Sequence, residues 1–494
     1  MTTITNPKSN NLIPGSGHNY TREISAIFGL ALPLFVTQLG VSAIGFIDTM
    51  MAGHYGNSAL AGVAVGSSIC FPFIIALSGV MMAVTPITAQ LRGAKKTVEI
   101  APMVRNALGL GLIFSALLFF LMGQMDPLLR MMELGDEVTG VVRGYLWGIS
   151  FGFPAAACYF VLKSVVEGLG NTRPQMVISI ISVGFNYFAN DTLIHGRYGF
   201  PELGGTGCGV ASGLTFWFFL IMILGYMHLN KACKRIAIFS SLSLPSVRGI
   251  MEILKLGIPI GGTLFMECSI FACITLFVGV LGPVVVGGHQ ITLNYSGLIF
   301  AVPLSIGMAI TIRAGHAIGR NEPEAARFSC IMGCAIALGL SIFTLSFTRF
   351  FPEVIAAIYT GDPEITKVAV SLLKICALYQ VSDAILTTSQ AALRGYKDAN
   401  MTFLMTFTAY WVITLPLGYV LSMTDLLGPP LGARGFWISL FIGLTISGTL
   451  LSLRLNRVSR RKIETCRGIS SRQLLADARV PAANQLHKGS YANS

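Results

Sequence analysis

Charged residues are scarce in this sequence and make up only 11% of its 494 residues. Soluble globular domains contain about 25%, so the composition excludes an ordinary soluble domain. Hydrophobic residues account for 53%, and the mean hydropathy is +0.70. The composition therefore predicts an integral membrane protein.

The patterns of catalysis and of metal binding are missing as well. None of the ten cysteines forms a CxxC pair, the seven histidines show no metal-ligand spacing, and no nucleophile lies beside a base. A glycine-rich run at 204–209 resembles a phosphate-binding loop, but no strand precedes it. The sequence therefore predicts no enzymatic activity and no resident cofactor. Residues 1–23 are polar and lack the apolar core of a cleavable signal.

Apolar runs of about 20 residues, the length that crosses the hydrocarbon core, follow one another along the chain. We place twelve of them at 25–50, 58–90, 103–123, 141–163, 176–195, 207–229, 252–281, 287–313, 328–348, 369–392, 401–423 and 433–454. The predicted fold is an all-α integral membrane protein with twelve transmembrane helices and both termini on one side.

Lysines and arginines are unevenly distributed over the two sides that this topology defines. Most of the 34 lie on the side of the termini. The other side carries only Arg130, Arg143, Arg197, Arg349, Lys367, Lys374 and Arg434. By the positive-inside rule both termini are cytoplasmic. Because the basic residues lie in short loops next to helix ends, they predict contact with anionic lipid and not with nucleic acid.

The two halves of the sequence repeat each other. The run Leu-Ala-Leu-Pro that ends at Pro33 recurs as Leu-Gly-Ile-Pro ending at Pro259, and Gly93 falls on Gly319 at the same offset of 226 residues. Since each half holds an even number of helices, the repeats share one orientation and are related by an axis along the membrane normal, as in secondary transporters. The predicted parts are a cytoplasmic N-terminal segment (1–23), an N-lobe of six helices (24–230), a basic cytoplasmic connector (231–249), a C-lobe of six helices (250–455) and a basic cytoplasmic tail (456–494).

Four acidic residues lie within the apolar runs: Asp48, Asp191, Glu267 and Asp383. A carboxylate in the middle of a bilayer costs about 2.5–3.5 kcal/mol on insertion scales, and such groups mark ion or proton pathways. Asp48 corresponds in the repeat to Ile274, and Glu267 corresponds to Val41. Because structural residues of a duplication tend to persist in both copies, this asymmetry indicates function and predicts different sites in the two lobes.

The N-lobe acid Asp48 has candidate partners on the fifth predicted helix, where Asn186 and Asn190 are spaced i, i+4 and share a face. A carboxylate and two amides form either an oxygen cage for a cation such as Na⁺ or a hydrogen-bond shell around a titrating acid. Alternatively, Asp48 reaches water from near its helix end. Asp191 points about 100° away from Asn190, so it is either an accessory ligand or a partner of His195.

The C-lobe offers polar stripes on three predicted helices. Glu267 lies in the middle of its helix, Tyr379 and Asp383 are spaced i, i+4, and so are Gln290 and Asn294. A mid-helix carboxylate must face protein or a water-filled cavity. The C-lobe is therefore predicted to hold a polar site of its own, distinct from that of the N-lobe.

Several motifs in both halves carry a family resemblance. They are Phe46-Ile47-Asp48-Thr49-Met50-Met51-Ala52-Gly53, Glu167-Gly168-Leu169-Gly170-Asn171-Thr172-Arg173-Pro174, Pro201-Glu202-Leu203-Gly204-Gly205-Thr206-Gly207-Cys208-Gly209, Gly288-His289-Gln290-Ile291 and Leu393-Arg394-Gly395-Tyr396-Lys397-Asp398. On these motifs the chain resembles the multidrug and toxic compound extrusion (MATE) family, in its NorM-like bacterial branch, over about residues 22–455.

The resemblance implies an antiporter in the bacterial cytoplasmic membrane that exports organic cations against Na⁺ or H⁺. The family's first-helix acid falls on Asp48 and its partner amides on Asn186 and Asn190. Its second-lobe site for Na⁺ or H⁺ falls on Glu267, Asp383, Tyr379, Gln290 and Asn294. Asp191 departs from the pattern, since relatives usually carry an aromatic residue there. One chain holds a complete central cavity, so a monomer is expected to function. A flippase for a lipid-linked saccharide and a polytopic membrane enzyme are the alternatives.

Overall fold

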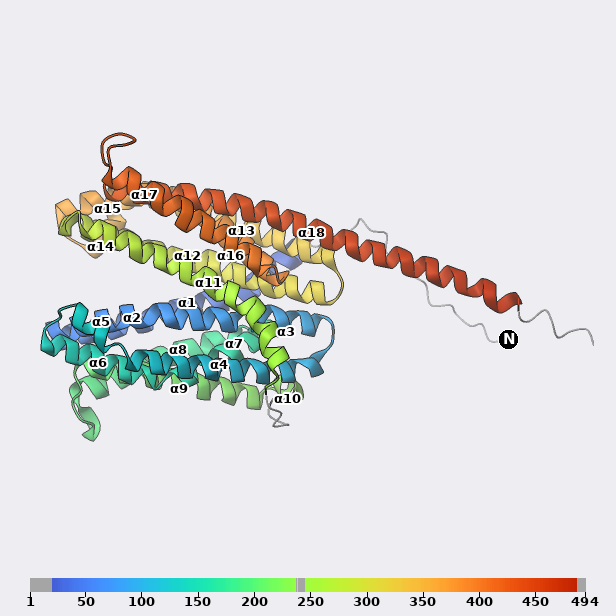
Figure 1. The fold of residues 1–494 in the computed structure, drawn as a ribbon, viewed down its shortest axis with the longest axis horizontal. Helices are drawn as coiled ribbons and strands as arrows, with labels where there is room; N and C mark the ends of the chain where they lie inside the picture. Colours follow the sequence, from blue (N-terminus) through green and yellow to red (C-terminus); the bar gives the residue numbers. More distant parts are fainter. Residues whose placement is uncertain (1–19, 237, 239–244, 487–494) are drawn as a thin grey trace, which may run out of the picture.

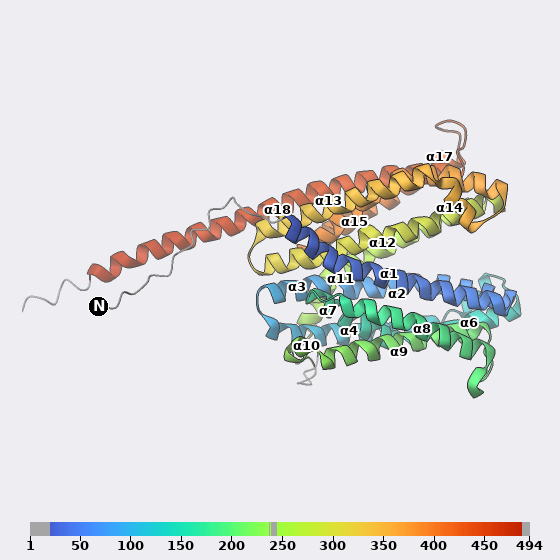
Figure 2. The same cartoon turned by 180° about the vertical axis from the view of Figure 1, so that it is seen from behind.

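The computed structural model describes residues 20–236, 238 and 245–486. Within these ranges the chain is almost entirely helical and holds no β-strand. The helices run roughly parallel to one axis and form two lobes side by side, one from each half of the chain (Figures 1 and 2). Parts of the predicted N-terminal segment, connector and tail lie outside the described residues.

The N-lobe contains the helices of the first half. They are α1 (Tyr20–Tyr55), α2 (Asn57–Met82), α3 (Val84–Gly93), α4 (Ile100–Gly123), α5 (Asp126–Met131), α6 (Asp136–Ser150), α7 (Phe153–Gly168), α8 (Arg173–His195) and α9 (Gly205–Leu229), followed by α10 (Lys231–Ile236). Short 3₁₀ turns lie at Thr97–Glu99 and Arg197–Gly199.

The C-lobe contains the helices of the second half. They are α11 (Val247–Gly279), α12 (Pro283–Gly319), α13 (Pro323–Phe350), α14 (Pro352–Tyr359), α15 (Pro363–Gly395), α16 (Ala399–Phe407), α17 (Leu415–Met423) and α18 (Ala433–Leu486), with a π-helical segment at Thr408–Thr414. Helix α18 continues well past residue 454 and leaves the bundle (Figure 1).

The number of membrane-spanning helices agrees with the prediction. In the described residues eleven helices are long and apolar enough to cross a membrane, and a bent pair makes the twelfth. This pair is α6 and α7, which meet at 46°. Pro154 lies in the first turn of α7, where a residue without a backbone N–H is tolerated and the preceding helix ends.

The backbones of the two lobes meet at the end of the bundle that carries the start of α1 and the ends of α3 and α12, which we call the connector end. A Cβ atom on Gly93 of α3 would lie 2.2 Å from the carbonyl oxygen of His316 and 3.0 Å from the Cα of Gly319, both on α12. Only glycine permits such an approach of two backbones. The two glycines therefore bring the repeat halves into backbone contact.

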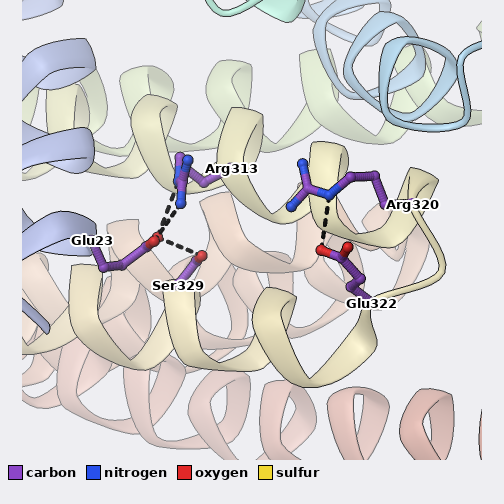
Figure 3. A network of polar contacts seen from close by, with 5 residues as sticks. All are labelled: Glu23, Arg313, Arg320, Glu322 and Ser329. Atoms are coloured by element: carbon purple, nitrogen blue, oxygen red, sulfur yellow. Dashed lines mark hydrogen bonds and ion pairs between the residues drawn. The ribbon is translucent and has the colours of Figure 1, made fainter. Parts of the chain in front are cut away.

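An ion pair joins the lobes at the same end (Figure 3). The guanidinium of Arg313 on α12 binds both carboxylate oxygens of Glu23 on α1, with 3.0 Å between Nε and Oε1. Ser329 on α13 donates to the same Oε1 at 2.6 Å. Glu23 is only 8% exposed, so a largely buried, bidentate ion pair fixes the start of α1 to the C-lobe.

Candidate functional site

Asp48 lies inside the N-lobe, between α1, α8 and α9. Its Oδ1 accepts hydrogen bonds from Nδ2 of Asn190 at 2.7 Å and of Asn186 at 3.2 Å, and its Oδ2 accepts one from Ser212 at 2.7 Å. Asp48 is 7% exposed and both asparagines are fully buried. The structure therefore brings together the three residues predicted for this lobe and buries Asp48 among their side chains.

The amides present their donor atoms to Asp48. Such an arrangement is a hydrogen-bond shell around a carboxylate, in which each bond to the charged group contributes about 1.5–3 kcal/mol. Rotation of both amides would present oxygens in place of nitrogens, and these oxygens with the carboxylate suit a small hard cation. The same residues can thus serve either form of the predicted site.

Asp191 lies apart from this group. Its carboxylate is 2.7 Å from Nη1 of Arg197 and 3.6 Å from Nδ1 of His195. Among the described residues it forms no hydrogen bond or ion pair with Asp48. Of the two alternatives from the sequence, the structure therefore shows Asp191 as a partner of His195. Arg197 is a second partner of Asp191.

Glu267 of α11 is paired with a residue that the sequence reasoning did not select. Gln390 of α15 donates from Nε2 to Oε1 of Glu267 at 2.7 Å, and the same nitrogen is 3.2 Å from Oγ1 of Thr406 on α16. Arg394, one turn beyond Gln390 and 5% exposed, interacts electrostatically with Glu267. Glu267 thus accepts a hydrogen bond from a neutral donor and interacts with a buried cation on the same helix as that donor.

Asp383 lies two turns before Gln390 on α15. It is 5% exposed and interacts electrostatically with Glu267, and Thr387 is its hydrogen-bonding neighbour. With Tyr379 and Ser296 it lines a cavity of about 10 Å³, which is room for about one water molecule. The structure therefore gathers Glu267, Asp383 and Tyr379 around one interior region of the C-lobe.

The other two residues predicted for this lobe occupy different surroundings. Asn294 of α12 is exposed and Gln290 is half-buried. Among the described residues neither forms a hydrogen bond with Glu267 or Asp383. The face of α12 that meets α15 at this level carries Ser296 instead. In this conformation Gln290 and Asn294 are therefore not hydrogen-bonded to either acid, and their membership of a C-lobe cation or proton site stays a prediction.

His289 is fully buried and its hydrogen bonds determine its tautomer. Trp437 donates from Nε1 to Nδ1 of the ring at 3.2 Å, so the proton of a neutral ring lies on Nε2, which is 3.1 Å from Oγ1 of Thr275. Trp437 also makes an edge contact with the ring of Tyr379, with 5.8 Å between centroids. His289 therefore supports Tyr379 through Trp437.

The family can be assigned once this arrangement is compared with known proteins. The MatE family profile matches residues 33–192 and again 259–420. The two matches begin 226 residues apart, as the internal repeat does, and together they cover more than half of the chain. The chain belongs to the MatE family. This membership confirms the resemblance seen in the motifs and places the protein in a family of multidrug efflux transporters.

Relatives with assigned names support the MatE assignment. The chain is 41% identical over 445 residues to the multidrug resistance protein PmpM of Pseudomonas aeruginosa, covering 89% of this chain and 93% of that one. It is 37% identical over 438 residues to the multidrug resistance protein NorM of Photobacterium profundum, covering 89% and 96%.

Solved structures of MatE relatives show the same fold. The eukaryotic MATE transporter AtDTX14 superposes with a TM-score of 0.81 at 19% identity, covering 90% of this chain and 99% of that one. The Vibrio cholerae MATE transporter VcmN in its bent form gives a TM-score of 0.79 at 16% identity, covering 90% and 98%. The predicted all-α fold with two six-helix lobes is therefore confirmed.

Proposed function

We propose that this MatE protein is a secondary active antiporter that exports organic, mainly cationic compounds in exchange for Na⁺ or H⁺ by alternating access. The observation that carries the proposal is the pair of unequal carboxylate sites, one inside each lobe. Asp48 has three side-chain donors, whereas Glu267 and Asp383 share one region with few donors. Two such acid sites inside one apolar bundle are suited to binding cations.

The N-lobe site supports a role in coupling. Binding of Na⁺ or H⁺ neutralises Asp48. The hydrogen bonds that Asn186, Asn190 and Ser212 donate to its carboxylate then become weaker. The side chains of α1, α8 and α9 then repack. An ion moves the equilibrium between two lobe arrangements only through different affinities for them, and a carboxylate at the junction of three helices provides such a difference.

The C-lobe site supports competition between ion and drug. When Glu267 and Asp383 are both anionic they repel each other in a medium of low polarity, and a cationic substrate or a coupling ion relieves that repulsion. Tyr379 offers an aromatic face beside Asp383, which favours an organic cation. Gln290 and Asn294 remain in the proposal as residues that act in another lobe arrangement.

The membrane placement follows from the charge distribution. We assign the protein to the bacterial cytoplasmic membrane with both termini cytoplasmic, because the basic loops gather at the connector end. Those loops favour anionic lipid. A single chain carries both lobes and both acid sites, so a monomer suffices. A flippase for a lipid-linked saccharide would need a basic cavity for pyrophosphate, whereas the side chains gathered at the two sites are mostly acids, amides and hydroxyls.

The test is transport of a fluorescent organic cation by the purified protein in lipid vesicles, with Na⁺ and pH gradients imposed separately. We expect cation movement under at least one gradient. Glu267→Gln and Asp383→Asn should abolish it while the protein still inserts and folds. If no gradient moves the cation, the proposed antiport is refuted.

A further inference from the structure

A continuous polar stripe lies along the buried face of α8. It consists of Gln175, Ser179, Ser182, Asn186 and Asn190, and each of these is 0% exposed. Their spacing keeps them on one side of the helix over about 22 Å, most of the thickness of a hydrocarbon core. Burying this many polar groups in apolar surroundings is costly unless each is satisfied.

The stripe connects two acidic residues. Its far end is the Asp48 site, through Asn186 and Asn190. At its connector end, Gln175 accepts a hydrogen bond from the hydroxyl of Tyr159 on α7 at 3.2 Å. Tyr159, Lys163 and Glu167 follow one another at i, i+4 on α7, and Glu167 is 2% exposed.

Several atoms of the stripe and of Glu167 have no partner with hydrogen-bond geometry among the described residues. They are Oδ1 of Asn190, Oγ of Ser182, Nε2 of Gln175 and Oε1 of Glu167, all shielded from bulk solvent. The nearest cation to Glu167 Oε1 is Nζ of Lys163, at 3.8 Å. Buried polar atoms of this kind are normally satisfied by internal water. On α8 these atoms lie about two helical turns apart, and the buried side chains of Ser179 and Asn186 lie between them.

We infer that the buried face of α8 is a hydrated proton route through the N-lobe, and that Glu167 is its second proton-binding group. The inference rests on the H⁺ form of the proposed antiport. A proton released from the carboxyl of Asp48 passes along water and the side chains of the stripe, and the carboxylate of Glu167 accepts it. Glu167 then releases it toward the connector end. Lys163 stabilises the anionic form of Glu167 between transfers.

The stripe suits a proton better than a metal ion. A hard cation takes several oxygen ligands at one place, whereas this stripe offers about one side chain per helical turn. In the described residues no cluster of three or more His, Cys, Asp or Glu side chains that could hold a metal occurs. A proton needs only a connected series of donors and acceptors.

Other titratable groups surround this end of α7. The ring of His316 on α12 hydrogen-bonds with the carbonyl of Gly168 at 2.8 Å, and the Arg92 guanidinium lies beside Gly170. Tyr226 of α9 accepts a hydrogen bond from Asn171 at 2.5 Å. Lys163 is the charged group paired with Glu167, and the others contact the loop that follows it.

The test uses the full chain in vesicles and compares matched variants. Glu167→Gln and Ser182→Val should lower the rate of cation transport driven by a pH gradient about tenfold or more, while equilibrium binding of the same cation changes less than about twofold. Ser182→Thr has the shape of valine but keeps the hydroxyl, so it should restore most of the rate that Ser182→Val loses. Glu137→Gln removes an exposed carboxylate on α6 and is the second control.

The outcomes separate this route from the antiport itself. Wild-type rates in both Glu167→Gln and Ser182→Val would overturn the route, as would transport by the wild type under a Na⁺ gradient alone, and either result leaves antiport intact. If the wild type moves no cation under any gradient, antiport fails. The route is then decided by infrared difference spectra between acidic and alkaline buffer, where Glu167→Gln must remove a protonated-carboxyl band. Persistence of every such band would overturn it.

Discussion

Replacing Arg313 with glutamine should separate the lobes at the connector end. Arg313 holds Glu23 through two bonds, and Ser329 adds a third (Figure 3). Removing one partner of a fully buried ion pair costs about 3–5 kcal/mol, and of an exposed pair about 0–1 kcal/mol. The Arg313 side chain is 30% exposed and that of Glu23 10%, so we expect about 2 kcal/mol.

A loss of this size changes the ratio of the two lobe arrangements about 30-fold, since 1.36 kcal/mol corresponds to a factor of ten. Amide hydrogen exchange measures the change directly. The peptides that cover the end of α3 and the end of α12 should exchange faster in Arg313→Gln, up to the same factor. Peptides in the cores of both lobes should keep their wild-type rates.

A matched control lies in the same region. Arg320 pairs with Glu322 at 2.8 Å, both side chains are close to half exposed, and both belong to the C-lobe. Arg320→Gln removes an equal charge without touching the contact between lobes, so its exchange should stay within about twofold of wild type. If Arg313→Gln and Arg320→Gln give the same exchange, the Glu23 pair does not hold the lobes together.

Other changes test the two sites and the glycine contact. Asp48→Asn should reduce ion-driven efflux about tenfold or more without loss of folded protein, because the amide still accepts hydrogen bonds, and vesicle transport with a folded-yield measurement checks this. Gln390→Ala removes the donor to Glu267 and should slow efflux about tenfold. Gln290→Ala should have a smaller effect, because Gln390 is the direct partner of Glu267. Equal effects of the two variants would contradict that ranking. Gly319→Ala places a Cβ 2.1 Å from the carbonyl of Gln90 and should raise exchange at the connector end, unlike Gly339→Ala, which meets nothing within 4 Å.

The sequence predicted the N-lobe group well, for a physical reason. Asn186 and Asn190 share a helix face by their spacing, and Asp48 needs donors because it is buried. Ser212 was missed since serine is common in glycine-rich membrane helices and its run showed no acid. The number of spans was predictable because length and hydropathy determine it.

The C-lobe partners were harder to predict. Helical spacing shows which side chains share a face, but not how that helix is rotated against its neighbours. Gln290 and Asn294 form a clear stripe on α12, yet Gln390 of α15 is the residue that reaches Glu267. A signal for Gln390 was present, since it lies seven residues after Asp383 and four before Arg394, on the same side of one helix.

The contact between Gly93 and Gly319 also reflects the duplication that produced the two halves of the chain. The two glycines are equivalent in the repeat, and residues on a two-fold axis meet their own equivalents. The contact therefore resembles a two-fold homodimer interface inside one chain, in which the two halves meet through equivalent residues. In a homodimer of two separate, identical halves, every substitution would appear in both halves. Fusion removes that constraint, so Asp48 can have Ile274 as its counterpart, and Glu267 can have Val41.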